Sequence, residues 1–295
     1  MNRLLALMSL GLAVLCPASA GLAEESPAPT SLPPIIAHRG ASKDAPENTM
    51  AAFRLAWLQK ADAIELDIHL TKDGRIVVCH DANTKKTTGV DKTIAQSTLE
   101  ELRTLDAGSF KGPQWKGEKL PTLEEVLAEV PQGKQAVIEV KCGPEALPEL
   151  QRVLRAWGKA PTQAAVISFK EDVCAQAKKL MPDIPVWLIV SVSKDLVGAW
   201  KPAANNLIRK AKAAGLDGLD LGCKSPLDPA YIRQVKAAGL KCFVWTIDDA
   251  ALARSLAAAG VDGITTNRPE WVREQLRSPA PASGGNLETA VPSGR

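Results

Sequence analysis

The stretch AIELDIHLTKDGRIVVCHD, residues 63–81, decides the fold of this chain. Two runs rich in β-branched residues, 63–70 and 75–80, flank the four residues TKDG at 71–74. An Asp-Gly pair between two such runs indicates a hairpin turn, whereas parallel neighbours need a crossover of about a dozen residues or more. The run 75–80 is therefore predicted to fold back antiparallel on 63–70.

The rest of the chain repeats one strand–helix unit. Short apolar runs, typical of buried parallel strands, lie at 34–38, 135–141, 164–169, 185–190, 218–221, 242–247 and 262–266. Helical patterns separate most of them, at 48–60, 122–130, 144–157, 173–180, 203–214, 229–238 and 249–259. Together with 63–70 these runs make eight parallel strands, which is the count of an α/β (β/α)8 TIM barrel.

Ala-Ala-Gly recurs at 213–215, 237–239 and 258–260, each time between a helix and a strand. Glycine suits the left-handed position after a helix, so the repeat supports alternating units. An open doubly wound sheet is the alternative architecture, but no Gly-x-Gly-x-x-Gly follows a strand. Residues 82–119 are poor in helical pattern, and we predict a small insertion there, above the barrel mouth.

Composition indicates a soluble globular chain. Of 295 residues, 36 are Lys or Arg and 33 are Asp or Glu, giving a formal charge of +3. Without a basic run, this small excess gives no reason to expect nucleic acid. No apolar stretch reaches the roughly 18 residues of a membrane-spanning helix. Nothing in the sequence indicates an oligomeric state.

The two ends are predicted to lie outside the folded domain at 34–277. Residues 1–20 resemble a cleavable signal peptide, with Arg3 before an apolar core and Ala18-Ser19-Ala20 at the cleavage positions. A Pro-rich linker at 21–33 follows, and the low-complexity tail at 278–295 is predicted to be disordered. Such a signal predicts a periplasmic or secreted protein.

Five cysteines remain once the signal is removed: Cys79, Cys142, Cys174, Cys223 and Cys242. Most lie in or beside apolar runs, which favours buried small hydrophobic residues. An exported protein can also form one disulfide, and the sequence does not pair it.

Charged residues and histidines collect at the C-terminal ends of four strands. They are His38 and Arg39, Glu65 and Asp67, His80 and Asp81, and Glu139 and Lys141. Barrel enzymes carry their active sites at this end of the barrel.

The carboxylates predict a metal site. Glu65 and Asp67 are two residues apart on a strand and share one face, as do Glu139 and Lys141. Buried carboxylates are costly without a cation. Three carboxylates against Arg39 and Lys141 therefore predict one divalent ion, and oxygen ligands favour Mg²⁺ or Ca²⁺ over zinc.

The hairpin also predicts the position of one histidine. With the turn at 73–74, Leu70 pairs near Ile76, and His80 lies beside the carboxylate pair. His38, at the end of the neighbouring strand, faces the same space. Two histidines, a metal and two cations suit a phosphodiester, because cations hold the phosphate while imidazoles transfer protons. His69 is expected to face away from the partners of His80 and is given no role.

In this order, several motifs closely resemble the glycerophosphodiester phosphodiesterase family. They are His38-Arg39-Gly40, Pro46-Glu47-Asn48-Thr49, 63–74, 77–81, Ile138-Glu139-Val140-Lys141, Val244-Trp245-Thr246 and 260–269. The resemblance covers about 34–277 and implies a barrel of the PLC-like phosphodiesterase type.

The resemblance also implies roles for individual residues. By it, His38 and His80 are the catalytic acid–base pair, Glu65, Asp67 and Glu139 bind the metal, and Arg39 and Lys141 contact the phosphate. Glu47 and Asn48 match the motif that shapes the floor of the site, and Phe169 and Trp245 are candidates for the walls of the alcohol pocket. Asn267 departs from the family, where aspartate is common, which leaves its role open.

The implied reaction is hydrolysis of a glycerophosphodiester to an alcohol and glycerol 3-phosphate, within glycerol and lipid metabolism. One alternative is a lysophospholipase D or a sphingomyelinase D-like phosphodiesterase acting on lipids. Two others are a glycosidase using Glu65 and Glu139 and a non-catalytic binding protein of the same fold. A binding protein would be expected to have lost a histidine or a carboxylate, and none is missing.

Overall fold

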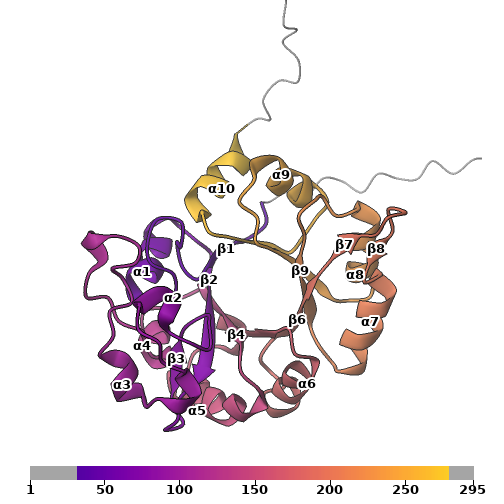
Figure 1. Ribbon diagram of the computed structural model, residues 1–295. Helices are drawn as coiled ribbons and strands as arrows, with labels where there is room; N and C mark the ends of the chain where they lie inside the picture. The colour runs from indigo at the N-terminus through magenta and orange to yellow at the C-terminus, as the bar shows by residue number, and fades with distance from the viewer. Residues whose placement is uncertain (1–31, 279–295) are drawn as a thin grey trace, which may run out of the picture.

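The computed structural model describes residues 32–278, which form a closed parallel barrel (Figure 1). Eight parallel strands make the ring: β1 (Ile35–His38), β2 (Ala63–Leu70), β4 (Gln135–Val140), β5 (Ala164–Ser168), β6 (Val186–Ser191), β9 (Gly218–Gly222), β10 (Lys241–Trp245) and β11 (Gly263–Thr266). Pairing of β1 with both β2 and β11 closes the ring. The barrel prediction is confirmed.

The ninth strand, β3 (Ile76–Val78), pairs antiparallel with the outer edge of β2. Leu70 lies opposite Ile76 and Ile68 opposite Val78, which is the predicted register. The pairing extends one step further, because the Cys79 amide donates to the Asp67 carbonyl at 2.9 Å. The short turn therefore delivers the chain after β3 to the level of the carboxylates on β2.

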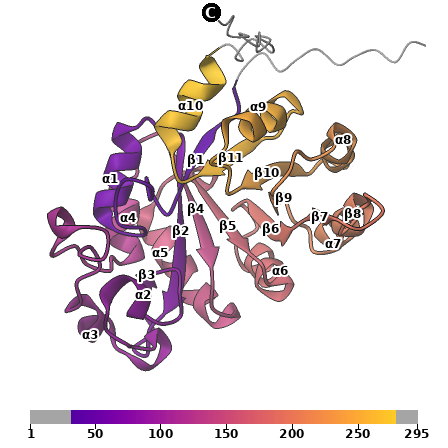
Figure 2. The same ribbon diagram turned by 45° about the horizontal axis from the view of Figure 1, so that its top comes forward.

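Helices surround the ring (Figures 1 and 2). They are α1 (Met50–Leu58), α4 (Leu123–Ala128), α5 (Leu147–Trp157), α6 (Glu171–Leu180), α7 (Ala204–Ala213), α8 (Pro229–Ala237), α9 (Ala250–Ala258) and α10 (Pro269–Arg277). Six of the seven predicted helical segments contain one of them, and the seventh, 173–180, misses the first two residues of α6. Two elements were not predicted from the sequence. One is α10, which buries little beyond Pro269 and Val272. The other is a hairpin of two-residue strands, β7 (Ser193–Lys194) and β8 (Trp200–Lys201).

The repeated Ala-Ala-Gly triplets end helices as predicted. Gly215, Gly239 and Gly260 have φ angles of +66°, +77° and +82°, in the left-handed region that a glycine adopts without steric cost. Each glycine turns the chain from an outer helix back toward the next strand.

Side chains fill the lower bore of the barrel. The inward-facing positions are apolar there: Ile36, Ala63, Val137, Ala165, Ile167, Trp187, Ile189 and Phe243. The rings of Trp187 and Phe243 stack with centroids 3.8 Å apart. Because this packed plug occupies the bore, a ligand can enter only from the C-terminal rim.

The segment 82–119 lies beside the barrel, which corrects the expectation that it sits above the mouth. Its short helices α2 (Lys85–Thr88) and α3 (Leu99–Arg103) lie outside the ring next to β2 and β3 (Figures 1 and 2). A small apolar cluster holds it against the hairpin: Val77, Cys79, Ile94, Leu102, Leu105, Ala107 and Leu120.

All five cysteines of the described residues are free thiols, and all but the half-buried Cys142 are buried. Within residues 32–278 no helix is long and apolar enough to cross a bilayer. The predicted signal peptide at 1–20, nearly all of the linker at 21–33 and all but the first residue of the tail at 278–295 lie outside the described residues.

Candidate active site

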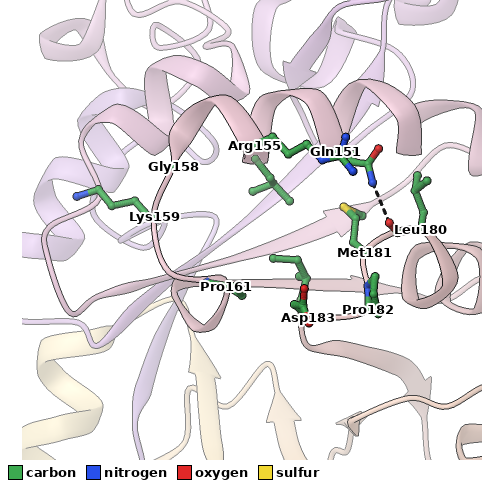
Figure 3. Close-up of a pocket in the computed structure, with 11 residues that line it drawn as sticks. Gln151, Arg155, Gly158, Lys159, Pro161, Leu180, Met181, Pro182 and Asp183 are labelled. Atoms are coloured by element: carbon green, nitrogen blue, oxygen red, sulfur yellow. Dashed lines mark hydrogen bonds between the residues drawn. The ribbon is translucent and has the colours of Figure 1, made fainter.

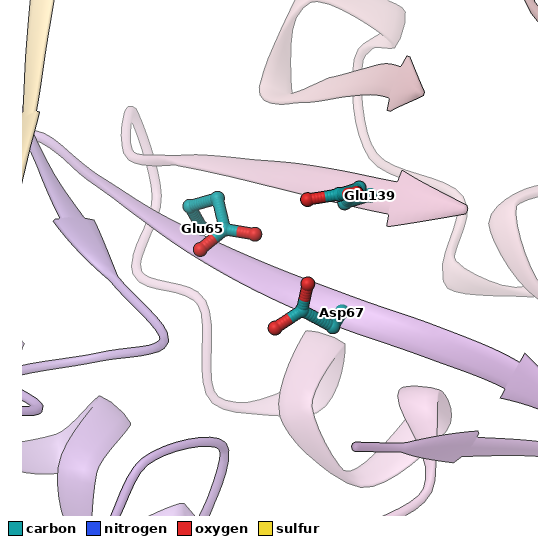
Figure 4. A group of neighbouring side chains, drawn as sticks. All are labelled: Glu65, Asp67 and Glu139. Atoms are coloured by element: carbon teal, nitrogen blue, oxygen red, sulfur yellow. The ribbon is translucent and has the colours of Figure 1, made fainter. Parts of the chain in front are cut away.

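Three carboxylates from two adjacent strands converge at the rim (Figure 4). Glu65 and Asp67 come from β2 and Glu139 from β4, and one oxygen of each lies within 4.8 Å of the others. All three side chains are buried, and neither Glu65 Oε1 nor Asp67 Oδ1 has a hydrogen-bond partner among residues 32–278. Oxygen donors left unpaired in this way suit a hard divalent cation, so the residues fit the predicted metal.

The pKa values of the three carboxyl groups differ from those of free carboxyl groups. Burial, and then the charge of Asp67, raises the pKa of Glu139 to about 7. The same causes hold the pKa of Glu65 well above its usual value. Burial opposes ionisation of Asp67 too, but nearby cations, Arg39 foremost, hold its pKa below the usual value. Without a metal, the cluster therefore keeps protons near neutral pH.

Two cations approach the carboxylates from opposite sides. Nε of Arg39 lies 3.3 Å from Asp67 Oδ2, and its Nη1 donates to Glu47 at 2.9 Å. Nζ of Lys141 lies 2.8 Å from Glu139 and 3.6 Å from Asp67. Both cations are held in place by carboxylates and both line the pocket, where an anionic ligand would meet them.

A tight turn after β1 positions Arg39. Its φ of +57° is in the left-handed region, and its amide donates to Glu65 at 3.0 Å. Gly40 follows at φ +79°, where a Cβ would lie 2.6 Å from the Ala52 backbone. Only glycine fits so close to helix α1, so His38-Arg39-Gly40 is a structural requirement as well as a chemical one. Asn48, at φ +58°, donates to Asp67 at 2.8 Å and fixes that carboxylate.

His38 is a neutral imidazole with a defined tautomer. Burial, and then the charge of Arg39, lowers its pKa to about 4. Its Nδ1 lies 2.7 Å from Asn267 Oδ1. The amide orientation of Asn267 is set by Asp248, whose carboxylate accepts from both the backbone and side-chain N–H groups of Asn267. Asn267 Oδ1 is therefore an acceptor, Nδ1 of His38 carries the proton, and Nε2 offers a lone pair 4.0 Å from Glu65.

His80 follows the hairpin and is oriented at both ring nitrogens. Nδ1 lies 2.6 Å from Asp81 Oδ1, and Nε2 lies 3.2 Å from Lys141 Nζ. Because lysine only donates, Nε2 is the acceptor in this contact and Nδ1 donates to Asp81.

The expectation for His69 was wrong. Its Nε2 lies 3.1 Å from the carbonyl oxygen of His80, so it lies on the side of the site and helps to hold the His80 backbone. Strand alternation gives the reason, since residues 65, 67 and 69 share one face of β2.

One pocket of about 180 Å³ at the rim is lined by both histidines, both cations and two of the three carboxylates, Glu65 and Glu139. Its walls include Phe169 and Trp245, whose rings meet edge to face at 5.4 Å. The volume lies below the roughly 300–1,000 Å³ of pockets for drug-sized ligands, so a small molecule fits best.

Two carboxylates of this region were missed from the sequence, Asp248 and Asp220. Asp220 lies in β9 and lines the pocket, and burial followed by the charge of Glu139 raises its pKa to about 8. A charged residue within the apolar run 218–221 was the available signal, the same signal that identified Glu65. Asp248 gave no such signal, because its partner Asn267 is 19 residues away in another βα unit.

A larger cavity of about 290 Å³ lies at the opposite end of the barrel, between α5 and α6 (Figure 3). Gln151, Lys159 and Asp183 are among its lining residues, and the Gln151 amide donates to the Leu180 carbonyl. This cavity has no histidine and no carboxylate cluster, so it lacks the chemistry of the rim site.

A barrel with two histidines, three carboxylates and two cations at its C-terminal rim defines the phosphodiesterase class of TIM-barrel enzyme. Residues 38–271 match the model of the glycerophosphoryl diester phosphodiesterase family. The chain belongs to this family, and it is an enzyme, a phosphoric diester hydrolase.

Related sequences and solved structures support the same family assignment. A glycerophosphodiester phosphodiesterase of Caldanaerobacter subterraneus is 36% identical over 247 residues, covering 82% of this chain and 97% of the relative. One from Bacillus subtilis is 31% identical over 290 residues, covering 91% and 96%. An Oleispira antarctica phosphodiesterase, solved in complex with the product sn-glycerol-3-phosphate, aligns with a TM-score of 0.75 and 31% identity over 84% of this chain and 98% of that one.

Proposed function

We propose that this enzyme hydrolyses glycerophosphodiesters to an alcohol and glycerol 3-phosphate, with His38 and His80 as its proton-transfer groups and one divalent cation as cofactor. The observation that carries the proposal is the convergence of both imidazoles, both cations, Glu65 and Glu139 on one small pocket, with Asp67 in the same carboxylate cluster. The product bound to the Oleispira antarctica enzyme supports the same substrate class.

Glu65, Asp67 and Glu139 are the proposed ligands of Mg²⁺ or Ca²⁺. When bound, the ion neutralises charge that develops on the phosphate oxygens. Arg39 and Lys141 bind the same phosphate from either side of the cluster. Arg39 is held rigidly by Glu47 and Asp67, so little conformational freedom is lost when the substrate binds.

His38 is the proposed general base. A base must be neutral at the working pH and must present a lone pair to the proton that it removes. The low pKa of His38 meets the first condition, and the hydrogen bond from Nδ1 to Asn267 meets the second by leaving Nε2 free.

His80 is the proposed general acid, which protonates the leaving alkoxide from Nε2. Asp81 accepts from Nδ1 and stabilises positive charge on the ring. In this role Lys141 donates to the phosphate in place of Nε2, which frees Nε2 to carry the proton. If His80→Ala kept most of its activity with every leaving group, good or poor, the assignment would be wrong.

One assay tests the whole proposal. Turnover of glycerophosphocholine and glycerophosphoethanolamine is measured before chelation, after chelation, and after Mg²⁺ or Ca²⁺ is added back. Loss on chelation and recovery with one of the ions is expected. Activity that survives complete chelation would contradict the metal assignment, and a glycosidase would hydrolyse neither substrate.

The attacking group is tested by isotope and product analysis. Direct attack by water places ¹⁸O from labelled water on the phosphate in a single step. Attack by the glycerol 2-hydroxyl instead forms a cyclic phosphate that water opens later, so this cyclic product would be detected at early times.

One surface feature favours a second candidate, a lysophospholipase D or sphingomyelinase D-like activity. Leu196 and Val197, at the tip of the β7–β8 hairpin, are fully exposed, and Phe169 at the pocket is 46% exposed. Apolar side chains of this kind can contact lipid. Hydrolysis of a long-chain lysophospholipid faster than of glycerophosphocholine would favour this candidate.

We also propose export to the periplasm or the medium, with a role in scavenging phosphate or glycerol. The proposal rests on the charged start, apolar core and small residues of positions 1–20. Sequencing of the exported protein is expected to begin at Gly21, and an uncleaved protein retained in the cytoplasm would contradict it.

A further inference from the structure

The pocket contains one buried carboxylate that the proposed reaction does not use. Asp220 lies in β9, four strands away from β2 in both directions around the ring, so it faces the metal-ligand strand across the bore (Figure 1). Asp220 is 4% exposed, and it lines the same pocket as His38 and Glu139.

Asp220 has an oxygen without a partner. Oδ1 is buried and makes no hydrogen bond within the described residues. Its inward-facing neighbours on β9 are Gly218 and Gly222, which have no side chain to donate a hydrogen bond. The Trp245 indole N–H donates at 3.1 Å to the Asp220 carbonyl, so it holds the backbone and leaves the carboxyl group unsatisfied.

An unsatisfied buried carboxyl group is costly and calls for a ligand. The comparable orphan oxygens on Glu65 and Asp67 belong to the carboxylate triad, which accounts for them. Asp220 is not a member of that triad. A group that enters the pocket can supply its partner, since the part of the chain that the structure describes supplies none.

We propose that Asp220 binds a hydroxyl group of the glycerol moiety of the substrate and so selects glycerol-bearing phosphodiesters. The inference rests on the proposed function and names its specificity determinant. Arg39 and Lys141, on the β1 and β4 side, attract the phosphate, while Asp220 on the far side offers it no positive charge. The phosphate therefore lies toward the cations, and the hydroxyl-bearing arm reaches across a pocket of about 180 Å³ toward Asp220.

The test pairs a change in the enzyme with a change in the substrate. Asp220→Asn and Asp220→Ala are each assayed with glycerophosphocholine and with two analogues that lack either the terminal or the middle hydroxyl. We expect kcat/KM for glycerophosphocholine to fall by about 10- to 100-fold in Asp220→Ala, because the substrate hydroxyl is left buried without its partner. The loss is expected to be smaller in Asp220→Asn, which keeps one side-chain oxygen as an acceptor. For the analogue lacking the bound hydroxyl, the loss is expected to stay within about threefold, because the contact is already absent.

Four results would overturn the inference. Equal losses with all substrates would indicate a structural role, and no loss with any would indicate no role. A loss confined to cationic leaving groups, found by comparing choline with an uncharged alcohol, would place the leaving group and not the glycerol at Asp220. Metal affinity is measured by calorimetry in parallel, and a drop of more than about tenfold would assign Asp220 to the metal instead.

Controls separate failure of this inference from failure of the fold or of the proposed function. Asp183→Asn makes the same chemical change at the opposite end of the barrel (Figure 3), and it is expected to alter nothing. Thermal unfolding of the Asp220 variants is expected at or above the wild-type temperature, because each removes a buried unpaired carboxyl group.

A binding measurement on the unmodified enzyme needs neither turnover nor a variant. Glycerol 3-phosphate is expected to bind at least about tenfold more tightly than propyl phosphate, and equal affinities would overturn the inference. If the wild type hydrolysed no glycerophosphodiester, the proposed function would fail while this comparison still tested Asp220.

Discussion

Binding of a divalent cation to this enzyme should release protons from the carboxylate cluster. Glu139, with a pKa of about 7, and Glu65, with a pKa well above its usual value, hold protons in the metal-free protein. A bound metal requires the ionised carboxylates, so these protons must leave when it binds. Affinity should therefore rise with pH through the neutral range.

The size of the effect follows from Glu139. With a pKa of about 7, its carboxyl group is about nine-tenths protonated at pH 6 and about one-tenth protonated at pH 8. The number of protons that Glu139 releases when the metal binds should therefore be lower at pH 8 than at pH 6 by about 0.8. The same protonation equilibrium raises the apparent affinity about tenfold over this interval, or about 1.4 kcal/mol. The raised pKa of Glu65 changes the affinity in the same direction.

Calorimetric titration with Mg²⁺ or Ca²⁺ measures the release directly, when it is repeated in two buffers that differ in ionisation enthalpy. Glu139→Gln should lose the part that Glu139 contributes and bind the ion more weakly. Glu274→Gln, an exposed position on α10, is the matched control and should behave as the wild type. Proton release near zero at pH 6, or an affinity that is flat from pH 6 to pH 8, would refute the reasoning.

Three further predictions concern the packing and the orientation of the site. Trp187→Ala removes a stacked ring from the bore and should lower the free energy of unfolding by about 3–5 kcal/mol in urea titrations; a loss below about 1 kcal/mol would mean that the bore repacks. Asn267→Ala should lower kcat by about 10- to 100-fold, a smaller effect than removal of the His38 imidazole itself. In this variant ¹⁵N NMR should show the His38 proton shared between both ring nitrogens. An unchanged His38 tautomer would exclude the orienting role of Asn267. Gly222→Ala puts a Cβ 2.7 Å from Cζ2 of Trp245, so KM should rise and stability should fall by about 1–3 kcal/mol; unchanged KM would show that Trp245 does not shape the bound substrate.

The strand pattern and the hairpin were readable from the sequence because both depend on local chemistry. Near-continuous apolar runs mark strands that are buried on both faces, and the Asp73-Gly74 turn leaves β3 no direction except antiparallel to β2. The two-residue period of a strand then puts Glu65 and Asp67 on one face, and the register brings His80 to their level. These arguments need no knowledge of distant parts of the chain.

Other features became visible only when the ring closed. Asp220 shares a pocket with the carboxylates of β2 and β4 because β9 stands across the bore, and no local pattern states which strands face each other. Asn267 reads as a departure from the family in sequence, but beside Asp248 it is a donor on one side and an acceptor on the other, which sets the tautomer of His38.

The sequence alone thus determined the strand count, the sense of the hairpin and the residue types that meet at the rim, since spacing and turn chemistry act over a few residues. The tertiary structure decided which groups across the bore are paired and which are left without a partner. Hydrogen bonding and burial depend on distances between segments far apart in the sequence, 229 residues for His38 and Asn267, and these distances exist only once the barrel has closed.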